Sequence, residues 1–138
     1  MLGGCDKFRC DWNANYTATT QADAGNITGK YTLSSFSKKV MEYDGKYKKI
    51  STSYLELSRN GTYKIINAPD WLIDESGNSS QKYFTKNGKW QITCDGKRCL
   101  LQLKGIAEGN IFFKSNNKYL ILLVVGDTDN CRSMVYVK

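Results

Sequence analysis

Two short turns, each between segments of alternating apolar and polar residues, constrain the fold of this chain more than any other feature. The first turn lies in Arg59–Gly61. A two-residue Asn-Gly loop would place Leu57 opposite Lys64, so that one face would mix apolar and charged residues. A three-residue loop places Leu57 opposite Tyr63 and gives a single apolar face. The sequence therefore predicts a hairpin with the three-residue loop and with Gly61 at a positive φ.

The second turn separates two alternating segments, Trp90–Cys94 and Cys99–Leu103. The residues that share one face when Cys94 is paired with Cys99 are Trp90, Ile92, Leu101 and Leu103. Directly opposite residues of a sheet have Cβ atoms about 4.5–5.5 Å apart, close to the spacing that a disulfide requires. The register therefore predicts a hairpin closed by a Cys94–Cys99 disulfide, whose very short loop limits its entropic contribution.

The rest of the chain contains further short segments of the same kind, mostly joined by short connections. They are Lys30–Phe36, Ile111–Phe113, Tyr119–Val125 and Met134–Val137, with one more expected around Tyr43–Ile50. No stretch shows a convincing helical period, and a short turn is expected at Trp71–Ile73 inside a long loop from Ala68 to Lys86. About eight consecutive strands predict an all-β fold, a single up-and-down antiparallel β-barrel over residues 28–138.

Several short motifs connect the chain to known families. Gly29-Lys30-Tyr31 resembles the Gly-X-Trp opening of lipocalin-like barrels, with Tyr in place of Trp, and Gly88-Lys89-Trp90 repeats the pattern. Other stretches are similar to those of a set of small uncharacterised bacterial proteins, often lipoproteins: Asn67–Trp71, Asn87–Trp90 and Gly126–Asp129. In that set Pro is common where Thr128 stands here. The resemblance covers Gly29–Lys138 and implies a lipocalin-like barrel with no assigned activity.

The first residues, Leu2–Cys5, resemble a bacterial lipobox. In that family the Cys becomes the lipidated first residue of the mature chain, so the resemblance implies acyl chains on Cys5 that anchor the protein without spanning the membrane. Residues 1–27 are then a signal remnant, tether and N-terminal arm. The protein is expected to be extracytoplasmic, in the periplasm or at the cell surface. An accidental match of four residues is the alternative.

The other cysteines fit an oxidising compartment. With Cys5 lipidated and Cys94 paired with Cys99, an even remainder of Cys10 and Cys131 is left, and we expect these two to pair. Buried free thiols are the alternative. No metal is expected, because the chain has no His and the Cys94 to Cys99 spacing is unlike that of zinc ligands.

The chain has a formal net charge of +7, and five lysines lie within Lys38–Lys49. The ordinary interpretation is a solvated surface loop, and the alternative is a surface for an anionic partner. Nucleic acid is not expected, because only four arginines are present and Arg is favoured for bidentate phosphate recognition. In a nucleic-acid interpretation the stacking side chains would be those of Tyr43, Tyr47 and Tyr54.

No catalytic motif is recognisable, and we expect neither enzymatic activity nor a cofactor. The chain lacks His, which is the commonest general base, and it has no nucleophile elbow or phosphate loop. Asp70, Asp74 and Glu75 share one long loop, but nothing in the sequence positions them as the carboxylate pair of a hydrolase. Asp127–Asn130 lacks the Gly and the distant Glu of an EF-hand calcium loop, which favours an ordinary turn.

Two functions remain for a non-enzymatic binding protein. In the first, the barrel binds a small hydrophobic or amphipathic molecule. The candidate interior residues are Tyr31, Leu33, Leu55, Leu57, Tyr63, Ile65, Trp90, Ile92, Leu101 and Leu103, for which plain core packing is the ordinary interpretation. An interior cavity of about 300 Å³ or more would favour a ligand. In the second, a tethered monomeric module of the inhibitor or immunity type has a filled barrel and binds a protein through Lys38–Lys49 and Ala68–Lys86.

Overall fold

The computed structural model describes residues 16–20, 26–43, 46–48, 52–74, 78–115, 118–125 and 133–138, which contain nine strands of one antiparallel sheet. The strands are β1 (Thr17–Ala18), β2 (Gly29–Leu33), β3 (Tyr54–Leu57), β4 (Thr62–Pro69), β5 (Tyr83–Cys94), β6 (Cys99–Leu103), β7 (Ala107–Ser115), β8 (Lys118–Val124) and β9 (Ser133–Val137). The described helical segments are α2 (Ser35–Tyr43) and the 3₁₀ turn η2 (Asp70–Ile73).

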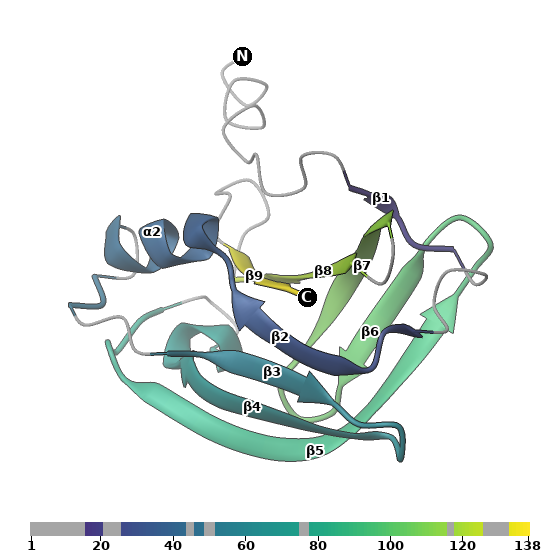
Figure 1. Cartoon of the computed structure of the whole chain (residues 1–138). Helices are drawn as coiled ribbons and strands as arrows, with labels where there is room; N and C mark the ends of the chain where they lie inside the picture. The colour runs from purple at the N-terminus through teal and green to yellow at the C-terminus, as the bar shows by residue number, and fades with distance from the viewer. Residues whose placement is uncertain are drawn as a thin grey trace.

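Strands β2 to β9 each pair with their neighbours in the sequence, and β9 returns to pair with β2 (Figure 1). This closes an eight-stranded barrel and confirms the predicted all-β, up-and-down architecture. The extra strand β1 lies along β7 at Phe112 and Phe113, beyond the point where β6 begins. Part of the predicted N-terminal arm therefore continues the barrel wall.

The hairpin of β3 and β4 has the predicted register. Leu57 lies opposite Tyr63, and Leu55 lies opposite Ile65. Gly61 adopts a φ of +86°, a value that glycine reaches without steric cost. The three-residue loop is therefore confirmed, and it puts the apolar residues of both strands into the barrel.

The hairpin of β5 and β6 is also as predicted. Trp90 lies opposite Leu103, and Cys94 lies opposite Cys99. The two cysteines form a disulfide, with their Cα atoms 4.1 Å apart. The turn between them is held by the Asp95 carboxylate, which accepts backbone hydrogen bonds from Lys97 and Arg98. These two bonds hold the pKa of Asp95 below its usual value.

The loop expected at Ala68–Lys86 is shorter than the sequence suggested, because β4 and β5 extend into it. The register shifts between Ile65 and Ala68, where Asn67 has a φ of +52°. The side-chain amide nitrogen of Asn67 donates a hydrogen bond to the Thr52 carbonyl at 3.1 Å. This bond attaches the irregular residue to the segment just before β3. A β-bulge of this kind bends a strand, and here β4 continues beyond the bulge to η2. The short turn expected at Trp71–Ile73 is confirmed.

The helix α2 was not predicted. β2 ends at Leu33, so the strand expected over Lys30–Phe36 is too long, and the described part of Tyr43–Ile50 contains no strand. The Ser34 hydroxyl accepts a hydrogen bond from the Ser37 amide at 3.2 Å, which caps the first turn. With only nine residues, α2 offers few i,i+4 pairs for sequence periodicity to detect. No helix in the described ranges is long and apolar enough to cross a membrane.

A small second apolar cluster lies on the outer face of the barrel, over β8 and β9. Its buried members are Leu120, Leu122 and Val135, and Phe36 of α2 and Phe112 of β7 pack against them. The inward residues of β8, such as Ile121 and Leu123, are buried in the main core. The uninterrupted apolar sequence of β8 therefore reflects burial on both faces, as in strands covered on two sides.

We expect the Cys94–Cys99 disulfide to stabilise the barrel only modestly. A loop this short predicts a loss of about 2 kcal/mol in the free energy of unfolding when the bond is removed. Urea unfolding of a Cys94→Ala/Cys99→Ala variant beside the parent protein measures this loss. Addition of a thiol reductant should then lower the stability of the parent protein. The variant cannot lose the contribution of this bond, because the bond is already absent from it. A variant that does not fold would contradict the modest role.

Candidate functional site

The barrel interior is the first candidate site, and its predicted lining residues do converge there. Those with relative exposures of 0–2 % are Tyr31, Leu55, Leu57, Tyr63, Ile65, Leu101 and Leu103. Leu33 is buried, and Trp90 and Ile92 are half-buried against the same cluster. A side chain beside a water-sized void would keep some exposed surface, so these exposures show tight packing around the buried members.

Strands β7 to β9 complete this interior with residues that the sequence did not single out. They are Ile111, Tyr119, Ile121, Leu123, Met134 and Tyr136. The odd-numbered residues of the apolar run at 119–125 turn inward, but alternation could not single them out. The run was too uniform for the two faces to be distinguished, since both are apolar.

The interior is rich in tyrosine, and the tyrosine hydroxyl groups form hydrogen bonds within the protein. The Tyr31 hydroxyl donates to the Ile27 carbonyl at 2.6 Å. The Tyr136 hydroxyl lies 2.8 Å from the Ser53 hydroxyl, which in turn donates to a backbone carbonyl of β4. Burial raises the pKa of Tyr31 and of Tyr136, so both remain neutral phenols. Groups satisfied in this way stabilise the barrel and offer little to a polar ligand.

The Tyr63 ring lies over Gly88, the residue directly opposite it on β5. A Cβ atom on Gly88 would lie 2.9 Å from the Tyr63 ring, so the ring occupies the space of a missing side chain. Its hydroxyl donates to the Lys104 carbonyl at 2.6 Å, which ties β4 to the turn between β6 and β7. Burial raises the pKa of Tyr63. The glycine of the Gly88-Lys89-Trp90 motif therefore serves aromatic packing.

One end of the barrel is closed by an aromatic cluster that joins two segments distant in sequence. Tyr47 packs edge-on against Trp71, with ring centroids 5.4 Å apart, and lies at the same distance from Tyr83. The Tyr47 hydroxyl donates to the Asp70 carboxylate at 2.5 Å, and the same carboxylate accepts the Ser80 amide at 3.2 Å. Trp71 is fully buried. We call this end, formed by α2, residues 46–48 and η2, the helix end (Figure 1).

The outer surface of the helix end carries exposed apolar side chains among lysines. Tyr43 at the end of α2 is 68 % exposed and Ile73 at the end of η2 is 50 % exposed, and they are the large hydrophobic side chains left exposed in the described ranges. Exposed lysines lie on the same segments: Lys38, Lys39, Lys46 and Lys48. The two segments that the sequence assigned to a protein partner are thus brought to one end of the barrel.

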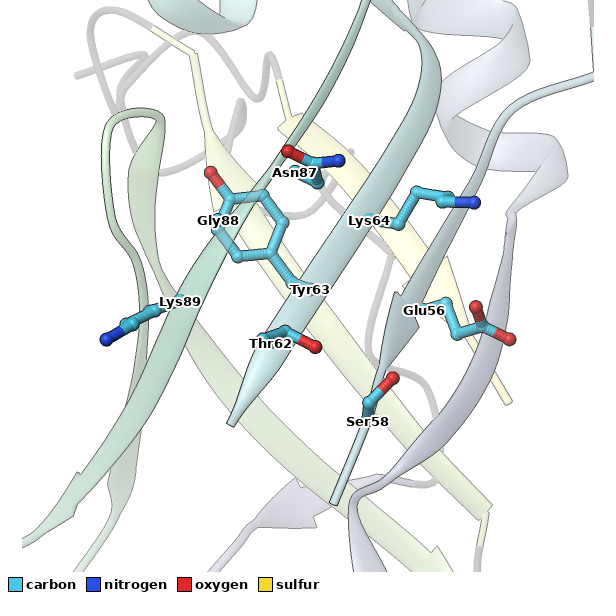
Figure 2. A pocket seen from close by; sticks show the side chains of 8 residues that line it. All are labelled: Glu56, Ser58, Thr62, Tyr63, Lys64, Asn87, Gly88 and Lys89. Atoms are coloured by element: carbon cyan, nitrogen blue, oxygen red, sulfur yellow. The ribbon is translucent and has the colours of Figure 1, made fainter. Parts of the chain in front are cut away.

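A groove of about 450 Å³ lies on the outer wall, over β3, β4 and β5. Its lining residues are Glu56, Ser58, Thr62, Tyr63, Lys64, Asn87, Gly88 and Lys89. Glu56 lies opposite Lys64 across the strands, and Lys64 lies opposite Asn87. Figure 2 shows Lys64 and Lys89 extending in opposite directions. Because the polar groups do not converge on one point, the groove is a weaker candidate than the helix end.

Among the described residues, those considered for a carboxylate pair or for base stacking form neither kind of site. Asp70 is committed to Tyr47 and Ser80, and Asp74 accepts the Asn78 amide at 3.3 Å. Glu75 lies outside the described residues, so the structure places no carboxylate pair. The three tyrosines considered for stacking form no common surface. Tyr47 is buried, whereas the Tyr54 ring lies on the outer wall under the Lys30 ammonium, 4.2 Å from its centroid.

Cys5, the expected site of lipidation, and the expected Cys10–Cys131 pair lie outside the described residues, as does the turn at Asp127–Asn130. In the described ranges no group of three or more His, Cys, Asp or Glu residues could hold a metal ion. No protein-family model matches the chain, and no curated protein or solved structure shows significant similarity to it. Assignment of a site therefore depends on the geometry of this chain alone.

Tyr47→Phe tests whether the hydrogen bond to Asp70 holds the helix end together. Because the substitution leaves the carboxylate without this donor, we expect the free energy of unfolding to fall by roughly 1–2 kcal/mol at neutral pH. Urea unfolding measures the loss. Tyr43→Phe, at the exposed end of α2, is the matched control and should change stability by less than half as much. Equal losses in the two variants would contradict the role of the bond.

The same variant has a defined effect at alkaline pH. Burial, and next the hydrogen bond to Asp70, raise the pKa of Tyr47 from 10.0 to about 12. The unfolded chain therefore loses this proton first, so the contribution of the neutral phenol is complete below pH 10 and is lost as the pH rises from about 10 to about 12. Tyr47→Phe should lose stability less steeply than the parent protein across this range, as measured by urea unfolding at successive pH values.

Gly88→Ala should destabilise the barrel by about 1–3 kcal/mol, because the new methyl group meets the fixed Tyr63 ring. Tyr63→Leu removes the ring that the methyl group would meet. In the double variant the substitution at Gly88 should therefore cost much less than it does alone, and urea unfolding of the four proteins gives the coupling. Strictly additive losses would show that the ring and the glycine do not depend on each other.

Proposed function

We propose that this protein is a non-enzymatic, extracytoplasmic binding protein whose helix end binds a protein partner. The observation that carries the proposal is the exposure of Tyr43 and Ile73 at the helix end. Aromatic side chains are enriched at protein–protein contact surfaces. Lys46 and Lys48 lie in the sequence between α2, which carries Tyr43, and η2, which carries Ile73. Their positive charges would steer an acidic partner.

The packing of the interior supports a protein partner over a small ligand. A barrel of eight strands can hold either side chains or one small molecule, and here the largest fully buried side chains include four interior tyrosines and Trp71. Trp71 fills the helix end from within, held through Tyr47 and Asp70. A ligand would have to displace this cluster, whereas a protein partner could bind its outer side.

The extracytoplasmic location rests on two features of the chain. The Cys94–Cys99 disulfide is of the kind that persists in oxidising compartments. The lipobox-like sequence at Leu2–Cys5 supports a lipid anchor on Cys5, in keeping with the resemblance to lipocalin-like bacterial lipoproteins. In this proposal the acyl chains hold the barrel at a membrane surface as a tethered module.

Site-specific photocrosslinking in the cells that produce the protein tests this function. A photoreactive amino acid replaces Tyr43 or Ile73, and the matched control positions are Glu56 and Lys89 on the outer wall. We expect one adduct of discrete mass from the helix-end positions and none from the control positions. Adducts of the same mass from all four positions, or from the control positions alone, would overturn the assignment. A small molecule retained in native mass spectra of the purified protein would favour the interior instead.

A further inference from the structure

At the barrel end opposite the helix end, the half-buried side chain of Lys138 follows directly after β9. The Lys138 ammonium group donates hydrogen bonds to the Asn26 and Thr28 carbonyl oxygens, each at 2.6 Å. It also lies over two aromatic rings, 5.2 Å from the centroid of Tyr119 and 5.8 Å from that of Tyr31. Four groups from two separate segments, residues 26–31 and Tyr119, therefore lie around one cation. We call this end the lysine end.

The backbone of β2 leaves room for this lysine. Gly29 has a φ of +133°, and a Cβ atom there would lie 3.2 Å from Cδ of Lys138. Both the backbone conformation and the close approach favour glycine at this position. The end of the lysine side chain therefore passes over the Gly29 backbone, in a space that we call the channel.

The chemistry of the lysine end selects one kind of group. A primary ammonium has three N–H donors, of which two are used by the carbonyl oxygens, and its charge is attracted by the faces of Tyr31 and Tyr119. No carboxylate of the described residues pairs with it. Burial lowers the pKa of Lys138. A quaternary ammonium would lack the donors, and a neutral amine or alcohol would lack the charge.

We propose that the lysine end is a binding site for an unbranched primary alkylammonium group, which the chain fills with its own Lys138. The resident lysine joins the segment before β2 to the end of β9 and so stabilises the place where the barrel closes. A lysine side chain or a polyamine from outside takes the same position when Lys138 is removed. This site is independent of the helix end, so either assignment can fail without the other.

Chemical rescue of Lys138→Ala tests the proposal. We expect this variant to melt roughly 5 °C below the parent protein, a shift in keeping with the loss of a few interactions in a domain of this size. Addition of n-butylammonium chloride should recover part of the shift, because a ligand that binds only the folded state raises its stability. Tetramethylammonium chloride and n-butanol, at equal concentrations and matched ionic strength, should recover little.

Two matched variants make the rescue specific. Lys138→Met fills the channel with an uncharged side chain, so n-butylammonium should not raise its melting temperature. Lys118→Ala removes an exposed lysine at the start of β8 and should neither need nor show rescue. Equal recovery by butylammonium and tetramethylammonium, or rescue of Lys138→Met, would overturn the site, because neither result requires hydrogen bonds within an open channel.

The parent protein offers a second measurement should Lys138→Ala fail to fold. In NMR spectra that detect lysine Nζ, we expect one ammonium group with slow hydrogen exchange, attached to an alkyl chain shifted upfield by the tyrosine rings. Lys138→Met should remove this signal and no other. If every lysine ammonium exchanges as rapidly as that of a free side chain, Lys138 is not enclosed and the proposed site does not exist.

Discussion

The seam between β2 and β9 is the constraint on which the barrel depends, because it converts an open meander into a closed wall. Thr32 pairs with Val137 and Leu33 with Tyr136 across it, and the Ser34 amide adds one backbone hydrogen bond, to the Val135 carbonyl. Side chains extend this short ladder at both ends. The Ser37 hydroxyl of α2 donates to the Ser133 carbonyl and accepts the Val135 amide, as a neighbouring strand would, and Lys138 joins β9 to the residues before β2. Closure thus combines two strand pairs with two polar side chains.

The interior and the helix end follow from how polar groups are satisfied inside a closed wall. The hydroxyl groups of the interior tyrosines form hydrogen bonds with backbone atoms or with serine. The barrel can therefore bury tyrosines at positions where purely aliphatic residues could also pack. At the helix end the same principle joins Tyr47 to Asp70 and brings two distant segments together. The side chains left over, Tyr43 and Ile73, then lie on the outside. The proposed binding surface is therefore a consequence of how the barrel end is closed.

The sequence predicted the features that depend on local pairing. Both hairpins, the positive φ at Gly61 and the Cys94–Cys99 bond follow from two short turns, because register and burial of one face determine each other. The helix α2 and the bulge at Asn67 were not predictable in this way. A nine-residue helix leaves little periodicity in the sequence, and the bulge depends on contacts with Thr52 and Thr85 on other segments.

The candidate site was predictable only in part, for a related reason. The interior residues of the two hairpins were predicted from alternation, and the two segments proposed to contact a partner were selected for lysine content and loop length. Their meeting at one barrel end depends on Tyr47, which the sequence offered only as a stacking residue, and on Asp70, which it offered only as a carboxylate. The role of Lys138 had no local signal, because its hydrogen-bond partners lie more than a hundred positions away.

The two-sided burial of β8 has a consequence for how the chain reaches its folded state. Local hairpins form early, whereas closure joins β9 to β2 across most of the sequence and is correspondingly slow. Until then β8 and β9 present apolar side chains on both faces, beside backbone groups that await a partner. Such a species is prone to pair with another copy of itself and aggregate. Folding of this chain therefore favours conditions that keep nascent molecules apart until the wall has closed.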